Sequence, residues 1–457
     1  MNSLELRASL GLAGLYALRL FGIFLILPVF ALHAGTLNGS NNTTWIGIAL
    51  GSYGLTQAVL QLPFGILSDR IGRKKVIYIG LILFACGSFI AASAQSIEML
   101  TLGRTIQGAG AISAAITALL ADLTREENRT RAMAMIGASI GITFALSLIL
   151  GPLLAHWIGV SGIFLLTGLL ALIGLLSVKY FIPDPIVSRF HSDAETDTRR
   201  LINVIRHAQL WRLNFGIFVL HSAQMAMFVV IPFVLISTGQ LDKAQHWKIY
   251  LPTVLLGFLF MVPAVLYGET RYRLKHVFIS AIALMTATQF GMAFTLNTLW
   301  DTVIWLTTYF LAFNVLEACL PSLISKIAPA ATKGTAMGVY NTAQSLGLFL
   351  GAVIGGWLYT HFGKLGVFSF TGGMMLCWLW IATTMDTPAA VKSKMFAIGQ
   401  HWQGDPLVLS RRLAAVAGVS EAIVIIDERV AYLKVAQQDW DEASVKQLIQ
   451  ETHNGIR

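Results

Sequence analysis

The sequence predicts an all-α polytopic membrane protein with twelve transmembrane helices in two bundles of six, followed by a small α+β domain. Three observations support this prediction. Apolar residues make up 56% of the 457 residues and charged residues only 12%, where soluble domains carry about 25%. Twelve apolar stretches are long enough to cross a bilayer. The C-terminal segment after them has a soluble composition.

Crossing a hydrocarbon core of about 30 Å takes roughly 20 helical residues. We expect the twelve helices at residues 10–33, 44–67, 76–94, 98–121, 134–157, 161–182, 213–236, 248–268, 276–296, 300–325, 334–358 and 366–385. Lys and Arg are concentrated in the loops after the even-numbered helices, and such loops stay on the cytoplasmic side. We therefore expect a multi-pass protein of the inner (plasma) membrane with both termini in the cytoplasm.

Polar segments divide the chain into five parts. We expect an N-terminal bundle at 1–182, a cytoplasmic loop at 183–212, a C-terminal bundle at 213–385, a linker at 386–393 and a cytoplasmic domain at 394–457. The formal net charge of +9 divides into +11 for residues 1–397 and −2 for the remainder. Because the mean hydropathy is +0.69, we assign the basic excess to loops that flank the lipid bilayer and expect no nucleic-acid partner.

The two bundles carry a trace of duplication. Residues 130–135 (TRAMAM) resemble residues 332–337 (TKGTAM), and each segment begins a predicted helix directly after a basic loop. Internal repeats are typical of secondary transporters, in which the substrate site lies between the repeats.

The loop between the second and third helices contains residues 65–75, GILSDRIGRKK. A basic cytoplasmic loop explains the Lys and Arg residues, but it does not explain the pair Asp69-Arg70 at fixed spacing between Gly65 and Gly72, followed by Arg73. This segment resembles motif A of the major facilitator superfamily at every defining position.

Two further segments are similar to motifs of that family in the right order. Residues 104–110 (RTIQGAG) resemble motif B, which includes Arg104 and Gln107 and accompanies proton coupling in the family. Gly151 and Pro152 resemble motif C of its drug/proton antiporters, although leucine and alanine replace two later glycines. The resemblance covers the whole chain. It implies the major facilitator fold, a small-molecule substrate exchanged for H⁺, and no cofactor beyond the proton gradient.

The same resemblance implies that motif A is a conformational lock. Asp69 is expected to accept hydrogen bonds from the amides at the start of the eleventh helix, near Gly334, because the N-terminus of a helix favours an anion. The residues expected to pair around it are Arg70 and Arg73 with Asp122 and with Glu126 or Glu127.

Four ionisable residues lie well inside the predicted spans, and such groups are costly in hydrocarbon unless they have a function. They are Arg19, Arg104, His221 and Glu317. At 1.5 Å per residue, His221 and Glu317 both lie about 13 Å from the cytoplasmic boundary. We hypothesise that Glu317, coupled with His221, carries the proton. Arg19 and Arg104, with Gln107 beside them in motif B, would tune its proton affinity or bind an acidic group of the substrate. The alternatives are a core histidine for His221, a structural ion pair for Glu317, and packing braces for Arg104 and Arg19.

The C-terminal segment predicts its own small fold. We expect a strand at 394–398, a helix at 406–416, strands at 422–426 and 430–435, and a helix at 441–451. This βαββα order is a truncated ferredoxin-like fold and resembles heavy-metal-associated domains. Their CxxC motif is absent, and the three cysteines of the chain lie far apart, so we expect neither a metal site nor a disulfide. We expect this domain to bind a small ligand or regulator, or to stabilise the cytoplasmic face.

Together these patterns favour a monomeric, proton-coupled secondary active transporter that works by alternating access and exports a drug or another amphipathic compound. Two alternatives remain open. One is a proton-coupled transporter of a specific metabolite, and the other is a membrane sensor with a transporter-like body and a signalling C-terminal domain. No enzyme is expected, because the P-loop and HExxH motifs are absent.

Overall fold

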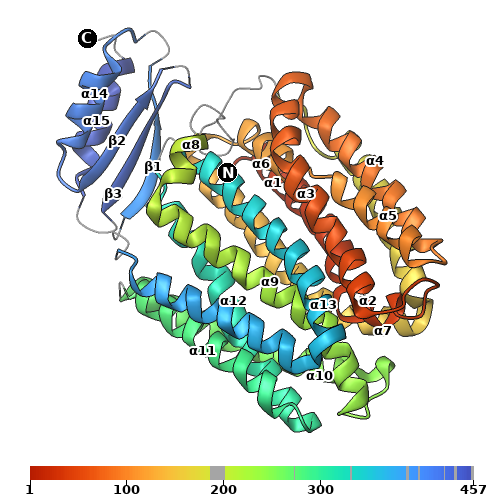
Figure 1. Ribbon diagram of the computed structural model, residues 1–457. Coiled ribbons are helices and arrows are strands. Elements are labelled where there is room, and N and C mark those ends of the chain that lie inside the picture. The colour runs from red at the N-terminus through yellow and green to blue at the C-terminus, as the bar shows by residue number, and fades with distance from the viewer. Residues whose placement is uncertain are drawn as a thin grey trace.

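A computed structural model describes residues 1–185, 201–271, 273–329, 332–386, 391–399, 402–426, 428–436 and 440–453, without the side chains of residues 126, 127, 130, 391–393 and 453. The N-terminal half contains α1 (Ser3–Phe24), α2 (Leu27–Ala34), α3 (Thr43–Ile71), α4 (Arg73–Ala92), α5 (Ile97–Ala109), α6 (Ser113–Asp122) and α7 (Glu126–Tyr180). After the short α8 (Leu201–Arg206), the C-terminal half contains α9 (Ala208–Ser237), the 3₁₀-helix η2 (Lys243–Gln245), α10 (Trp247–Thr270), α11 (Leu274–Thr295), α12 (Leu299–Ile327) and α13 (Lys333–Thr383). The two halves lie side by side, and the C-terminal domain, called the tail below, lies at one end of them (Figure 1).

The described residues confirm the expected membrane architecture. Nine helical segments in them are long and apolar enough to cross a membrane. Two of these segments, α7 and α13, each contain two spans, because Gly159 and Gly363 interrupt them with non-helical backbone. The more polar α3 has 29 residues, which is also enough to cross. The predicted twelve spans are therefore present in the predicted order.

The two interruptions are single glycines. Gly159 has φ 70° and ψ 171°, and Gly363 has φ 62° and ψ −158°. This region of backbone space is essentially restricted to glycine. A chain reversal that the sequence predicted as a loop at 359–365 is thus made at one residue, and both helical hairpins are almost free of connecting loop.

Two helices predicted as continuous are broken. The first span divides into α1 and α2 around Leu25 and Ile26, just before Pro28, a residue that disfavours the helix preceding it. The fourth span divides into α5 and α6 at residues 110–112. There Gly110 lies against the backbone of Gly80, so closely that a Cβ atom would collide with it. Periodicity along the chain gives no signal for either break.

Glycines allow α13 to approach helices on two sides. Gly347, Gly351 and Gly355 face α9, within the same half. On the other side, Gly47, Gly51 and Gly54 of α3 face residues Ala352, Phe349 and Ser345 of α13. At the end of this contact, the Thr43 hydroxyl donates to the Gly356 carbonyl at 2.8 Å. The two halves are therefore in direct backbone-level contact along α3 and α13.

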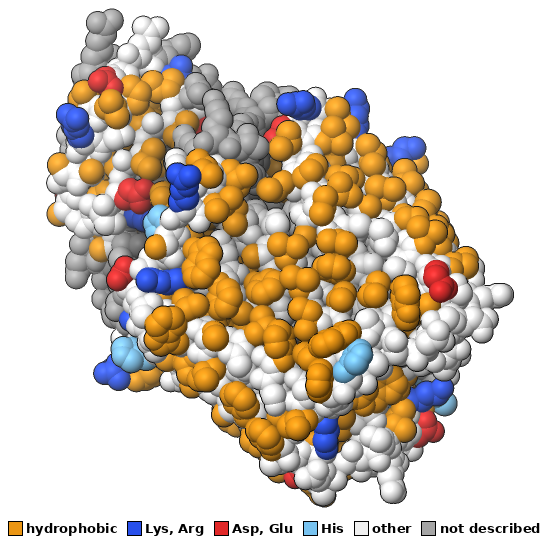
Figure 2. Space-filling model, viewed as in Figure 1, with side chains coloured by type: hydrophobic (Ala, Val, Ile, Leu, Met, Phe, Trp, Pro, Cys, Tyr) orange, Lys and Arg blue, Asp and Glu red, His pale blue; other side chains and the backbone are white. Residues whose placement is uncertain are grey.

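The outer surface suits a lipid environment. Figure 2 shows hydrophobic side chains over the middle of one face, with Lys, Arg, Asp and Glu side chains around its edge and on the tail. Trp157, Trp300 and Trp380 expose 73–75% of their surface near helix ends, as interfacial tryptophans do in membrane proteins.

The tail has the predicted βαββα order. It consists of β1 (Val391–Ala397), α14 (Pro406–Ala414), β2 (Val419–Ile425), β3 (Val430–Ala436) and α15 (Glu442–His453). The strands form an antiparallel sheet in the order β1-β3-β2, which fits a ferredoxin-like domain. Leu413, Leu433, Val435 and Val445 are fully buried between the sheet and the helices.

Two expected boundaries differ from the structure. β1 begins at Val391, inside the expected linker at 386–393. The expected loop at 183–212 contains α8 and the first turn of α9, whereas its residues 186–200 lie outside the described part of the chain. In both places a regular element extends into polar sequence, which a hydropathy pattern assigns to loops.

The contact between α3 and α13 makes Gly47 sensitive to substitution. In Gly47→Ala the new Cβ would meet the Ala352 carbonyl oxygen, so we expect a loss of about 1–3 kcal/mol in the free energy of unfolding. Gly137→Ala is the matched control, because nothing lies within 4 Å of the added atom. Thermal unfolding in detergent measures both, and equal melting temperatures for the two variants would refute this packing.

Candidate functional site

Glu317 of α12 and His221 of α9 face each other inside the C-terminal half, as their predicted depths suggested. Glu317 Oε2 lies 3.9 Å from His221 Nε2. The His221 side chain is 6% exposed, whereas that of Glu317, in the interior of its helix, is 35% exposed. Within the described part of the chain, Glu317 Oε2 has no hydrogen-bond partner. This carboxylate is thus available to a proton or a ligand.

Gln344 of α13 orients the imidazole. His221 Nδ1 lies 3.2 Å from the Ile217 carbonyl oxygen, and His221 Nε2 lies 2.7 Å from Gln344 Nε2. Because a carbonyl only accepts, Nδ1 carries the proton of the neutral ring, and Nε2 accepts a hydrogen bond from the Gln344 amide. The same Nε2 faces Glu317. The contact of Gln344 with His221 could not be predicted from the sequence, because a single Gln within a helix rich in small residues gives no distinguishing signal.

A row of aromatic rings leads from the N-terminal half to this pair. Phe24 of α1 contacts Phe144 of α7 with ring centroids 5.1 Å apart, and Phe144 lies 5.8 Å from Phe313 of α12. Phe313 lies 5.9 Å from both the His221 ring and the Tyr309 ring. An aromatic surface next to a carboxylate can bind a compound that has both an apolar and a polar part.

Arg19 of α1 and Arg104 of α5 lie together inside the N-terminal half, and Tyr53 of α3 joins them. Arg19 donates to the Tyr53 hydroxyl and to Ser113 Oγ, each at 2.9 Å. The Arg104 guanidinium lies 4.9 Å from the centre of the Tyr53 ring and donates to Gln107 Oε1 at 2.8 Å. The two motif B residues therefore act on each other, and a cation–π contact stabilises the buried charge.

The two arginines are 3% and 1% exposed. In the described residues neither has a carboxylate within ion-pair distance, and no hydrogen bond or ion pair connects them with Glu317 or His221. In this structure the four ionisable residues thus form two clusters, a cationic one in the N-terminal half and a titratable one in the C-terminal half. The sequence predicts this division, with two cations in the N-terminal half and a titratable pair in the C-terminal half. It does not predict the partners of each side chain, because it gives no information about which way a helix faces.

Motif C is a packing site between α7 and the break of the first span. A Cβ atom on Gly151 would collide with the Leu25 carbonyl oxygen and lie 3.1 Å from the Pro28 ring. Pro152 follows inside α7. These residues hold the fifth span against α1 and α2. Among the described residues, they make no hydrogen bond or ion pair with His221 or Glu317.

Motif A is centred on Arg73. Its guanidinium contacts Asp69, donates to Ser68 Oγ at 3.0 Å, and lies 3.4 Å from Asp122 Oδ2. Arg73 and Asp122 have side chains that are 3% and 0% exposed, so the predicted pairing of these two residues is confirmed. Gly72, with φ 103°, makes the sharp turn between α3 and α4, a conformation that favours glycine.

The other motif A expectations have different outcomes. Among the described residues Asp69 bonds only to Arg73, so its contact with the start of α13 at Gly334 is not formed in this conformation and stays a prediction. Gly334 itself is buried. Arg70 is exposed and has no ion pair in the described part. The side chains of Glu126 and Glu127 lie outside the described residues.

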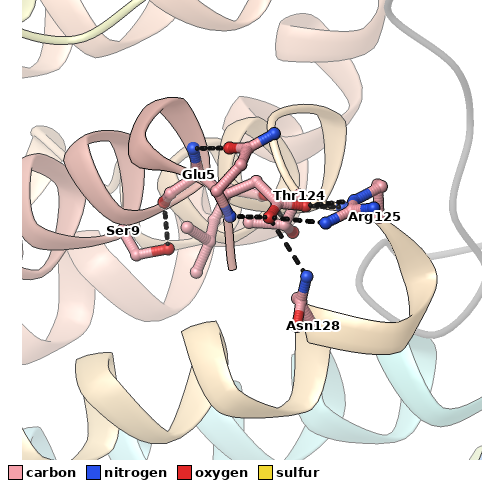
Figure 3. Close-up of polar contacts among 7 residues, drawn as sticks. Glu5, Ser9, Thr124, Arg125 and Asn128 are labelled. Carbon is pink, nitrogen blue, oxygen red and sulfur yellow. Dashed lines mark hydrogen bonds and ion pairs between the residues drawn. The ribbon is translucent and has the colours of Figure 1, made fainter.

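A second acidic contact near motif A was not expected. Glu5, at the start of α1, is 2% exposed, and Figure 3 shows it between the first span and the turn before α7. Its carboxylate accepts from Arg125 Nε at 2.9 Å and from Asn128 Nδ2 at 3.1 Å. Asn2 caps α1 together with Glu5, and this Asn-x-x-Glu capping box is the signal that could have identified the helix start.

Comparison with known proteins agrees with this architecture. The sequence profile of the Major Facilitator Superfamily matches residues 12–350 and 253–426. The chain belongs to the major facilitator superfamily.

The chain is similar in sequence to two named bacterial proteins. It is 40% identical over 447 residues to the inner membrane transport protein YajR of Escherichia coli, covering 98% of each chain. It is 26% identical over 347 residues to the multidrug resistance protein MdtH of Proteus mirabilis, covering 74% of this chain and 83% of that protein.

A solved superfamily structure shares the fold. The crystal structure of a bacterial homologue of the human lysosomal transporter Spinster aligns with a TM-score of 0.67 at 12% identity, covering 84% of this chain and 98% of that one. The chain is thus a multi-pass secondary transporter of the superfamily, with a tail beyond its twelve helices.

Motif A yields a stability test. Arg73→Gln removes a cationic partner of the buried Asp122 carboxylate, and hydrogen bonds to charged groups contribute about 1.5–3 kcal/mol. We expect the melting temperature in detergent to fall accordingly. Arg70→Gln, one turn away on the exposed surface, is the control and should change little. If both variants melted together, the Arg73 contacts would contribute nothing to stability.

Proposed function

We propose that this chain is a proton-coupled antiporter that exports drugs or other amphipathic compounds from the cytoplasm. It would work as a monomer, without a cofactor and without enzymatic activity. The observation that carries the proposal is the pair Glu317–His221 deep among the helices, where an ionisable acid is costly unless it has a function. The similarity to a multidrug resistance protein of Proteus mirabilis favours this class of substrate.

The location follows from the charges. The end of the helices that carries motif A also carries most Lys and Arg residues, which supports a location of this end, with both termini, in the cytoplasm. The similarity to an inner membrane protein of Escherichia coli favours that membrane.

The geometry supports a coupling mechanism. The proton would bind Glu317, whose Oε2 lacks a partner in the described structure, and the substrate would lie against the aromatic row that ends at Phe313. A charged carboxylate favours a cationic or polar group of the substrate, whereas a protonated one does not, so proton and substrate compete for the same residue. Competition of this kind is the minimal requirement for exchange.

A second candidate function rests on the arginines. Arg19 and Arg104 are buried without a described carboxylate partner, and uncompensated buried cations favour an anion nearby. A transporter of a specific acidic metabolite would provide one. Proteoliposome uptake assays with a panel of amphipathic cations and aromatic carboxylates distinguish the two candidates by the panel that is transported.

Glu317→Gln tests the proton site. In proteoliposomes with an imposed pH gradient, we expect substrate-driven proton flux to fall to the level of protein-free liposomes, because glutamine does not titrate. Glu269→Gln is the matched control, since Glu269 pairs with Lys326 at 2.6 Å on the same half, away from the aromatic row. Coupled flux that persists in Glu317→Gln would exclude this residue as the carrier.

Gln344→Leu tests the orientation of His221. The Gln344 N–H bonds to an Nε2 lone pair that exists only on the neutral ring. Without it no described side chain holds Nε2 toward Glu317, and we expect the rate of proton-coupled transport to fall by about five-fold, the effect of one net hydrogen bond.

Gln289→Leu is the control, because Gln289 is fully buried and bonds to Thr371 within the same half. It should lower stability without changing the transport rate of the folded protein. Identical transport rates for all three proteins would show that Gln344 does not orient His221 for transport.

A further inference from the structure

Both faces of the tail sheet are covered. Along β3, Ala431, Leu433 and Val435 face the helices α14 and α15, and Figure 1 shows these helices on the side of the sheet away from the membrane bundles. The alternate residues Val430 and Tyr432 are nevertheless only 3% exposed. A free three-stranded sheet with helices on one side would leave this second face in solvent.

Two contacts from this face reach different halves of the transporter. Arg129 Nη1, near the start of α7, lies 3.8 Å from the Met395 sulfur of β1. Lys434 Nζ of β3 lies 3.5 Å from the carbonyl oxygen of Ile327, the last residue of α12. Arg129 belongs to the N-terminal half and Ile327 to the C-terminal half. Both Arg129 and Lys434 are buried, at 2% and 8% exposed.

The sheet fixes the two contact points relative to each other. β1 and β3 pair without a register shift from Val391 opposite Ala436 to Ala397 opposite Val430. Met395 and Lys434 are therefore held by a continuous hydrogen-bonded ladder, not by a flexible loop. Alternating access changes the relative orientation of the two halves. A rigid sheet cannot keep both contacts when the distance between Arg129 and Ile327 changes.

We propose that the tail is a clasp that connects the two halves at the motif A end and favours the conformation in which both contacts form. Every transport cycle then requires the tail to release one half. A ligand or protein that binds the tail would change the transport rate without reaching the substrate site. The inference depends on the movement of the halves and not on the proton coupling proposed above.

Distance measurements between spin labels test the clasp. In a background without the three native cysteines, one label pair replaces Lys75 of the N-terminal half and Arg271 of the C-terminal half, both exposed near helix ends. Met395→Ala removes the first contact. Lys434→Met removes the second, together with the ion pair between Lys434 and Glu421 inside the tail. We expect each to reduce the population at the native separation, relative to other separations, by about five-fold, the effect of one net hydrogen bond.

Two controls accompany these variants. Leu407→Ala changes a residue that is 68% exposed on α14, on the side away from the bundles, and should leave the distribution unchanged. Lys434→Arg keeps the cation and should restore it. Hydrogen exchange at β2 and β3 shows whether the tail stays folded. An unchanged distribution in the combined Met395→Ala, Lys434→Met protein with a folded tail would overturn the clasp.

A second measurement needs no change in the contacts. Labels at Arg411 on the tail and at Arg131 or Arg271 on the halves report each side separately, and all three residues are exposed. When pH or substrate shifts the Lys75–Arg271 distance, the clasp requires that at least one tail distance changes as well. If the halves move and both tail distances stay constant, the tail does not bridge them and the proposal fails.

Discussion

The rest of the structure depends on one constraint, which is that hydrocarbon does not solvate charge. A charged group inside the helices must find its partners in the protein, and few arrangements supply them. Arg19 and Arg104 find a tyrosine, a serine and a glutamine. Each solution involves several helices, so the polar clusters also fix which helices are neighbours.

The two halves use this constraint differently. The N-terminal half holds permanent cations in a network that Tyr53 connects. The C-terminal half holds a histidine and a carboxylate whose charges can change. The duplication visible at residues 130–135 and 332–337 therefore conserved the scaffold but not the chemistry. The aromatic contact from Phe144 to Phe313 is one place where the two halves meet.

Much of the fold could be predicted because hydropathy and spacing are properties of the chain itself. The spans, the order of the tail elements and the pair Arg73–Asp122 follow from length, charge and motif. The break at Gly110 could not, because it coincides with a close contact to Gly80 of α4. The break near Leu25 lies just before Pro28, which a hydropathy pattern does not register. The contacts of Gln344 with His221 and of Arg104 with Tyr53 required knowledge of which way each helix faces.

The one-residue reversals at Gly159 and Gly363 have a consequence for how the transporter meets its surroundings. With a single glycine between two membrane spans, almost no chain protrudes there. A protease or an antibody would therefore have little exposed chain to bind at these two turns. Each hairpin also lacks a flexible loop that could absorb motion. A tilt of one span is therefore transmitted to the next, and the two spans move together as a rigid unit.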